Sequence, residues 1–262
     1  MKIGFIGFGE LSYCFARGID KTINIIAYDI NIEEAKKRAD ILSNVKIVNS
    51  LEELLNETKY IFVAVTGQND SDVFESIYDM SINDYLFIDL SSALPKCKEK
   101  ISNNLEKKNA KYVDVAVLGS VPKLLHKTPM MASGNGTTEL QSLASKLDMN
   151  ITMCGGHPGK ASTIKLCRSI FMKGLPALLI ETKRVASKYN VENEVFASIY
   201  KNLDDQCFEE YTIRLIDGAY KHWKRQKEEL EECAKIASDV GIDDDIIHSA
   251  IEIFDSLGET ND

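Results

Sequence analysis

Two closely spaced glycines near the start of the chain point to nucleotide chemistry. Gly7 and Gly9 end an apolar run that begins at residue 2, and Asp29 follows about twenty residues later. Gly7 permits a tight turn, and Gly9 lets the backbone approach a pyrophosphate, which the first N–H groups of a following helix can bind. Asp29 can accept hydrogen bonds from both hydroxyls of a ribose. The spacing therefore predicts a unit that binds a dinucleotide.

The charge on Asp29 also predicts which dinucleotide is bound. A carboxylate at this position would repel the 2′-phosphate of NADP, so we expect NAD, with NADP as the alternative. Lys36, Lys37 and Arg38 lie on the next predicted helix and could serve a 2′-phosphate instead. Ser12 replaces the third glycine of the usual pattern and is small enough for close packing of helix and strand. The residues expected to contact the cofactor are Gly7, Phe8, Gly9, Glu10, Leu11, Asp29, Val65 and Thr66.

A lysine in the second half of the chain could transfer a proton. Lys165 lies in the first turns of a long predicted helix, directly after the glycine-rich segment 155–159. Burial or a neighbouring cation lowers the pKa of a lysine towards neutrality, which suits it to proton transfer on an alcohol or a carbonyl. Arg168 would supply such a charge and could anchor a carboxylate or phosphate, as could Lys173. From the residues alone, a solvent-facing helical lysine is the alternative.

Two further pairs of residues stand where predicted strands end. Ser91 and Ser92 follow the strand 85–89, where their hydroxyls could hold a carboxylate; a turn or a helix cap is the alternative interpretation. Gly119 would let backbone N–H groups face a ligand, and Ser120 adds a hydroxyl. Ligands of parallel sheets bind at the carboxyl ends of the strands, so both pairs would stand at the edge of the sheet where a ligand binds.

The elements that would position these residues alternate between strand and helix as far as residue 154. Strands are predicted at 2–6, 23–28, 45–48, 60–65, 85–89, 112–117, 129–133 and 150–153. The helices between them begin with recognisable capping residues, such as Asn31, Ser50 and Thr137. This alternation predicts an α/β fold, namely a doubly wound, mostly parallel sheet of the Rossmann type.

After the glycines of 155–159 the pattern becomes helical. A long helix is predicted to end near residue 190, and others follow at 192–202, 205–223, 228–240 and 243–257, before a frayed tail at 259–262. The sequence therefore predicts a dinucleotide-binding domain over 1–155 and an all-α domain over 160–262.

Composition narrows the class of partner. The chain has 262 residues and a net charge of −9, which argues against nucleic acid. Its basic run, 221–227, is followed by acidic residues and is interpreted as a solvated helix. No apolar run approaches a membrane span, and the first strand begins so early that we expect no signal peptide. Six cysteines without paired or metal-ligand spacing predict a reduced, cytoplasmic protein with no metal site.

Four motifs in order resemble the β-hydroxyacid dehydrogenase family, which includes 3-hydroxyisobutyrate, tartronate-semialdehyde and 6-phosphogluconate dehydrogenases. Behind the glycine loop, 87–95 is similar to the family's D-x-S-T-x-x-P, and 113–120, continued by 128–134, is similar to its D-A-P-V-S-G-G. The segment 156–169 is similar to its G-x-G-x-x-x-K-x-x-N-N. The resemblance covers residues 1–185.

The resemblance implies an NAD(P)-dependent oxidoreductase that interconverts a small hydroxy acid and its oxo acid. It implies that Lys165 is the general acid/base, and that the helical domain covers the substrate cleft and forms a homodimer. The implied substrate contacts are Ser91, Ser92, Gly119, Ser120, Arg168 and Ser169. Leu118 and Ser169 replace a serine and an asparagine of the family, so we expect a subgroup with shifted specificity that holds a small anionic substrate through Arg168 or Lys173.

Two other functions also fit the sequence. An imine reductase of the pyrroline-5-carboxylate reductase type has a similar amino-terminal motif and length, but it has no obligatory catalytic lysine. A non-catalytic NAD-binding sensor or scaffold would retain the cofactor site, and the replacements at Leu118 and Ser169 are compatible with such a loss of chemistry.

Overall fold

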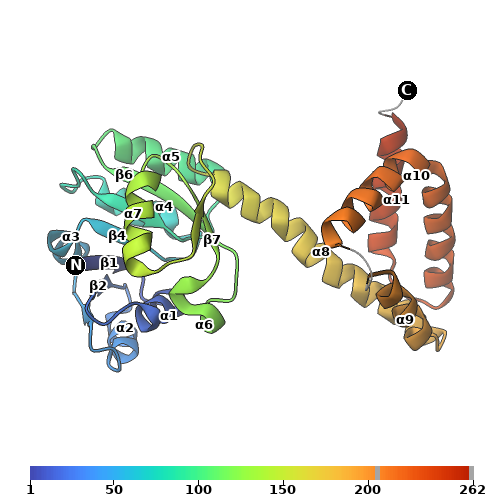
Figure 1. Cartoon of the computed structure of the whole chain (residues 1–262), viewed down its shortest axis with the longest axis horizontal. Coiled ribbons are helices and arrows are strands. Elements are labelled where there is room, and N and C mark those ends of the chain that lie inside the picture. Colours follow the sequence, from blue (N-terminus) through green and yellow to red (C-terminus); the bar gives the residue numbers. More distant parts are fainter. Residues whose placement is uncertain (204–206, 260–262) are drawn as a thin grey trace. The chain divides into compact units, whose positions relative to one another are not determined.

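The computed structural model of the protein describes residues 1–203 and 207–259. The chain forms two compact units, Met1–Arg168 and Ser169–Asp262 (Figure 1). The sequence placed a boundary at 155–159, whereas this division falls inside the helix α8 (Lys160–Lys188). The functional roles of the two predicted domains stay predictions. Across the described residues, no helix is both long enough and apolar enough to cross a membrane.

The first unit is built on a single sheet. Within the described residues, eight strands occur in the order β3-β2-β1-β4-β5-β6-β7-β8. They are β1 (Lys2–Ile6), β2 (Asn24–Tyr28), β3 (Val45–Ile47), β4 (Tyr60–Val63), β5 (Leu86–Asp89), β6 (Lys111–Val117), β7 (Met130–Ser133) and β8 (Ile151–Met153). β6 and β7 are antiparallel, and the other neighbouring pairs are parallel. The predicted doubly wound, mostly parallel fold is confirmed, and each predicted strand is present to within two residues at either end.

Helices flank this sheet, as Figure 1 shows. They are α1 (Glu10–Gly18), α2 (Ile32–Ala39), α3 (Leu51–Glu57), α4 (Asp70–Ile77), α5 (Pro95–Glu106), α6 (Val121–Leu124) and α7 (Thr137–Leu147), with a 3₁₀ turn, η1 (Leu125–Lys127), after α6. Two of the predicted caps form, at Asn31 and Ser50, whose side chains accept hydrogen bonds from the N–H groups of Glu34 and Glu53. Each cap satisfies an N–H group that has no partner inside its helix. The cap predicted at Thr137 is wrong, because Gly136 stands at the cap position of α7 and Thr137 is the first residue of the helix.

Two apolar cores lie on the two faces of the sheet, because successive side chains of a strand point to opposite faces. Phe5 and Phe62 stack in one core, with ring centroids 5.1 Å apart. Phe74, Phe87 and Tyr112 meet edge to face in the other. Burial on both faces explains why these strands read as nearly continuous apolar runs.

The second unit is helical in its described residues. Besides most of α8, it contains α9 (Glu192–Leu203), α10 (Phe208–Asp239) and α11 (Asp245–Glu259). Two separate helices were predicted where α10 is one element with a kink at His222, whose φ of −126° and ψ of 26° are not helical. The predicted helix start at Asp205 and the tail residues 260–262 lie outside the described residues.

Candidate functional site

The glycine loop has the geometry that its sequence predicts. Gly7 has a φ of +86°, and a Cβ there would lie 2.6 Å from the backbone oxygen of Ala64. A Cβ on Gly9 would meet no protein atom within 4 Å, so the start of α1 is open to a ligand. Ser12 is buried, and its hydroxyl donates a hydrogen bond of 2.6 Å to the oxygen of Gly7. Ser12 therefore holds the turn together at the position of the missing third glycine.

Asp29 ties the end of β2 to this loop. Its Oδ2 accepts a hydrogen bond from the N–H of Phe8 at 2.7 Å, and its Oδ1 accepts one from the N–H of Asn31 at 2.8 Å. Each carboxylate oxygen keeps a lone pair for a further donor, such as a ribose hydroxyl. A pocket of about 350 Å³ adjoins Asp29. It is lined by Ile6, Gly7, Tyr28, Asp29, Ile30, Leu51, Val65, Asn69, Asp72, Val73 and Ser76.

The other predicted cofactor residues surround the same strand ends. Phe8 has a fully buried ring, so its backbone is the part that can face a ligand. Glu10 is the exposed first residue of α1, and Leu11 follows it half-buried. Val65 lines the pocket, and Thr66, exposed, comes next along the chain after β4. The open start of α1 and the carboxylate beside the pocket thus fit the pyrophosphate and ribose of a dinucleotide.

Of the three basic residues on α2, Arg38 reaches the loop. Its Nη1 donates to the oxygen of Phe8 at 3.3 Å, and its Nη2 lies 3.4 Å from the carboxylate of Glu34. Lys36 instead pairs with Glu33 at 3.2 Å. Arg38 therefore stands beside the loop with its charge shared with Glu34.

Lys165 lies in the second turn of α8 and meets Ser92. Its Nζ donates a hydrogen bond of 3.0 Å to the Ser92 hydroxyl, which follows β5. Burial lowers the pKa of Lys165 below its usual 10.5, and the positive charge of Lys98 lowers it further, against an opposing effect of Asp114. An amine with a lowered pKa gives up its proton more readily than an ordinary lysine, which suits Lys165 to proton transfer.

The start of α8 is held by two side chains of the sheet, and sequence analysis missed this role. Asp114, fully buried on β6, accepts from the N–H groups of Gly159 and Ser162 at 3.0 and 2.9 Å, and from the Ser162 hydroxyl at 2.6 Å. Ser133 on β7 accepts from the N–H of Ala161 at 3.0 Å. These bonds satisfy the unpaired N–H groups of the first turn and so fix the helix that carries Lys165. A carboxylate inside the apolar run 112–117 was the signal that could have revealed it.

Ser91 and Ser92 point in different directions. Ser92 is exposed and meets Lys165, whereas Ser91 is buried and accepts a hydrogen bond of 2.7 Å from Nζ of Lys98. Lys98 also lies 2.6 Å from Asp89, and neither carboxylate oxygen of the neighbouring Asp70 has a hydrogen-bond partner. Burial, together with the charge of Asp89, raises the pKa of Asp70 to about 7.

The remaining predicted substrate residues are less closely tied to Lys165. Gly119 and Ser120 are exposed at the start of α6, where a Cβ on Gly119 would lie 3.1 Å from Pro129. Arg168 is exposed one turn after Lys165 on α8, and Ser169 is half-buried. Among the described residues, no hydrogen bond or ion pair joins these four to Lys165. The side chain of Lys173 lies outside the described part of the structure.

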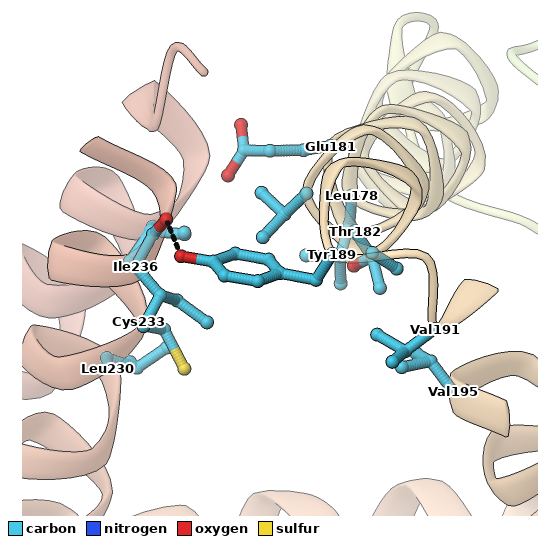
Figure 2. A pocket seen from close by; sticks show the side chains of 12 residues that line it. Leu178, Glu181, Thr182, Tyr189, Val191, Val195, Leu230, Cys233 and Ile236 are labelled. Carbon is cyan, nitrogen blue, oxygen red and sulfur yellow. Dashed lines mark hydrogen bonds between the residues drawn. The ribbon is translucent and has the colours of Figure 1, made fainter. Parts of the chain in front are cut away.

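A separate pocket lies wholly within the helical unit and is almost entirely apolar (Figure 2). It has a volume of about 560 Å³ and is lined by Leu178, Glu181, Thr182, Val185, Ala186, Tyr189, Val191, Val195, Leu230, Cys233, Ile236 and Ile247. Tyr189 points across it and donates to the oxygen of Ile236 at 3.1 Å. Glu181 accepts from the N–H of Ile246 at the start of α11, where a carboxylate is stabilising. No group of three or more His, Cys, Asp or Glu residues in the described part of the chain is placed to hold a metal ion.

The sheet and the glycine loop together define an NAD(P)-binding protein of the Rossmann type. Residues 2–158 match the family model described as the NAD binding domain of 6-phosphogluconate dehydrogenase, and the chain belongs to this family. Its broader relationship is to the β-hydroxyacid dehydrogenases, as the sequence motifs predict.

Two relatives illustrate the range of the family. An uncharacterised 28.5 kDa protein of Methanothermus fervidus is 28% identical over 90% of this chain and 90% of its own length. The mitochondrial 3-hydroxyisobutyrate dehydrogenase of Drosophila melanogaster is 23% identical over 79% of this chain and 65% of its own length.

Solved structures agree on the fold. A conserved protein of unknown function, described as structurally similar to 3-hydroxyacid dehydrogenases, is 25% identical with a TM-score of 0.68, over 100% of this chain and 98% of that one. An imine reductase from Aspergillus terreus in complex with NADPH4 has a TM-score of 0.83 over 99% of this chain and 94% of its own, at 12% identity. The chain is therefore a member of an NAD(P)-dependent oxidoreductase family whose fold serves more than one chemistry.

Proposed function

We propose that this protein interconverts a small hydroxy acid and its oxo acid, with Lys165 as the general acid/base. The observation that carries the proposal is the amine of Lys165, which has a lowered pKa and lies 3.0 Å from the Ser92 hydroxyl. When bound, NAD(P) supplies or accepts the hydride of this reaction. Because β1, β4 and β5 are parallel neighbours, their carboxyl ends, which lead into Gly7, Val65 and Ser92, meet at one edge of the sheet.

Lys165 accepts and donates the proton of the substrate hydroxyl. In the oxidation direction its neutral amine accepts this proton while the C–O bond becomes C=O and the hydride leaves the same carbon. In the reduction direction its ammonium returns the proton to the carbonyl oxygen. Ser92 accepts a hydrogen bond from Nζ and keeps the amine oriented, and Asp114 fixes the helix from which it projects.

The anionic group of the substrate is assigned to Arg168. Its exposed guanidinium lies one helical turn from Lys165 and offers a bidentate partner for a carboxylate or phosphate. Ser91, whose hydroxyl is engaged by Lys98, contributes by fixing the turn next to Ser92. Substrate contacts from Gly119, Ser120 and Ser169 stay predictions.

The preferred cofactor is NAD. The carboxylate of Asp29 is fixed by the N–H groups of Phe8 and Asn31, so it cannot easily swing away from a 2′-phosphate. Arg38, the basic residue nearest the loop, already shares its charge with Glu34. Electrostatic repulsion at Asp29 therefore opposes NADP.

We further infer a homodimer in the cytoplasm. α8 exposes large apolar side chains on several faces, including Ile170 and Ile180, which are 76% and 52% exposed. Exposed apolar side chains that gather on one element mark an association site. Analytical ultracentrifugation should give a dimer for the wild type and a monomer for Ile170→Lys. The six cysteines have no paired or metal-ligand spacing, which supports a reducing compartment such as the cytoplasm.

One activity screen separates the candidate functions. NADH formation is measured over small 2- and 3-hydroxy acids, free and phosphorylated, and NADH or NADPH consumption over the oxo acids and cyclic imines, with Lys165→Ala as control. Turnover of one acid that is lost in Lys165→Ala supports the proposal. Reduction of a cyclic imine that persists in Lys165→Ala would favour an imine reductase instead. NADH binding without any turnover would favour the sensor or scaffold.

A further inference from the structure

Lys98 is a lysine with no exposed surface, which is rare among lysines. It lies in the first turn of α5, and its side chain points into the first unit. Its Nζ lies 2.6 Å from Oδ2 of Asp89, 2.7 Å from the hydroxyl of Ser91 and 3.1 Å from the backbone oxygen of Ser91. These three acceptors satisfy all three N–H bonds of an ammonium group.

The partners of Lys98 are themselves fixed. Asp89 accepts hydrogen bonds from the N–H of Ser91 at 2.8 Å and from the hydroxyl of Tyr112 at 2.5 Å. The turn after β5 is therefore held by hydrogen bonds to the side chain of Asp89 and to the hydroxyl, the N–H and the backbone oxygen of Ser91. The next residue is Ser92, which accepts the hydrogen bond from Lys165. Lys98 thus fixes the peptide that carries the partner of Lys165.

Lys98 also acts on Lys165 through its charge. Burial has the largest effect on the pKa of Lys165 and lowers it. The positive charge of Lys98 lowers this pKa further, and the negative charge of Asp114 raises it. The groups that face Lys98 are Asp89 on β5, Asp70 on α4, whose Oδ2 lies 4.0 Å away, and Tyr112 on β6. The pKa of Asp70 is raised to about 7, and that of the Tyr112 hydroxyl is raised by burial. Of the two carboxylates, Asp89 lies closer to Nζ of Lys98.

Stability alone does not account for this ion pair. Replacing a buried pair by apolar residues of similar volume is often neutral or stabilising, because the charges must be removed from water. The Lys98–Asp89 pair lies directly behind the turn whose Ser92 meets Lys165, and both of its members form hydrogen bonds with Ser91 in that turn. Stability is therefore an incomplete explanation for a charged pair at this position.

We propose that Lys98 is a positioning residue for proton transfer: it fixes the Ser91–Ser92 peptide against Lys165, and it places a buried positive charge directly behind that peptide. The inference rests on the function proposed above, since it deepens the role given to Lys165. Its test does not depend on turnover. If no substrate is found, the protonation of Lys165 is still measurable.

The experiment measures the rate at which an amine-specific acylating reagent labels Lys165 in the full-length protein, by peptide mass spectrometry across a range of pH. Because the neutral amine reacts, the rate reports the neutral fraction. Lys98→Met should lower labelling of Lys165 by about 3- to 10-fold at a fixed pH below its midpoint, since a neighbouring charge changes a pKa by this order. Labelling of Lys160, exposed on the same helix, is the internal reference and should not change.

Asp89→Asn is the matched control, because it breaks the same ion pair but keeps the cation. The proposal predicts Lys165 labelling at or above the wild-type level in this variant. An equal fall in Asp89→Asn and Lys98→Met would mean that loosening of the turn alone explains the result, and would overturn the role proposed for the charge of Lys98. Unchanged labelling in Lys98→Met would overturn it as well.

A second variant covers the case in which Lys98→Met does not fold. The double variant Lys98→Met/Asp89→Asn leaves no unpaired buried charge from this pair, and it should still lower Lys165 labelling. If the protein turns over a hydroxy acid, the midpoint of its pH–rate profile should rise in the same variants. A profile that does not move while labelling falls would contradict the link between Lys98 and the reaction.

Discussion

Asp114 offers the sharpest test of how the chain positions Lys165. The Asp114 carboxylate accepts three hydrogen bonds, from the N–H groups of Gly159 and Ser162 and from the Ser162 hydroxyl, and it is fully buried. A hydrogen bond to a charged group contributes about 1.5–3 kcal/mol, and a buried donor left without a partner adds a cost. After partial relaxation and entry of water, Asp114→Ala should destabilise the start of α8 by about 3–5 kcal/mol.

Asp114→Asn should have a smaller effect. An amide can still accept from the two N–H groups through its oxygen, and its NH₂ group can donate to the Ser162 hydroxyl. The loss is then mainly that of the charge at a helix N-terminus, and we expect about 1–2 kcal/mol. Asp79→Ala removes the same charge from an exposed position and should change stability by less than about 0.5 kcal/mol.

Hydrogen exchange read by mass spectrometry is the assay, because it reports local opening of a segment. For peptides that cover 159–165, exchange should be about 100-fold faster or more in Asp114→Ala, since each 1.4 kcal/mol is a factor of ten. Asp114→Asn should lie between this variant and the wild type. The reasoning is refuted if Asp114→Ala exchanges like Asp79→Ala, or if Asn and Ala have the same effect.

Four further predictions follow from the site. Gly9→Ala should leave stability within about 0.5 kcal/mol, because its Cβ meets no protein atom, but should weaken NADH binding by about tenfold or more in a fluorescence titration. Unchanged affinity would show that the pyrophosphate does not approach Gly9. Asp29→Ser should shift the NADPH to NADH affinity ratio towards NADPH by about tenfold, and no shift would contradict the role of this carboxylate. Asp70 has a pKa raised from 3.8 to about 7, so the folded state keeps a proton that the unfolded chain releases, and stability should fall as the pH rises through this window. Asp70→Asn should abolish that fall, making the variant more stable than the wild type by about 2–4 kcal/mol above pH 7 and equal to it near pH 4 in urea unfolding; parallel pH curves would count against it. Arg168→Ala should raise KM for the acid by about tenfold or more with little change in kcat, and an unchanged KM would rule out this anchor.

Much of the fold was predictable because its signals are local. Each strand is a short apolar run between turn residues, and the two buried faces of the sheet preserve that run even where Phe5 and Ile6 face different cores. The caps at Asn31 and Ser50 are equally local. The kink at His222 was less accessible, since the charged run around it is compatible with one helix or with two. The short helix α6 escaped prediction because four residues leave no periodic pattern.

In the candidate site, too, the features with local sequence signals were predictable and those that depend on distant contacts were not. Gly7, Gly9 and Asp29 follow a spacing that local chain geometry imposes, so the glycine loop and the carboxylate beside it could be identified from the sequence. The support around Lys165 could not, because Asp114 meets Ser162 across 48 positions of sequence and Lys98 acts through a turn. A charged residue in a buried position was the available sign for both. Only the packing of α5 and α8 reveals which partner each charge has.

The most direct test of the central claim is the turnover of a hydroxy acid by Lys165→Met compared with the wild type, with NADH affinity measured on the same preparations. General acid/base catalysis contributes about 10²–10⁴-fold, so kcat should fall by at least about 100-fold while the Kd for NADH stays within about twofold. Wild-type kcat in Lys165→Met would contradict the account, because no proton transfer could then be assigned to Lys165.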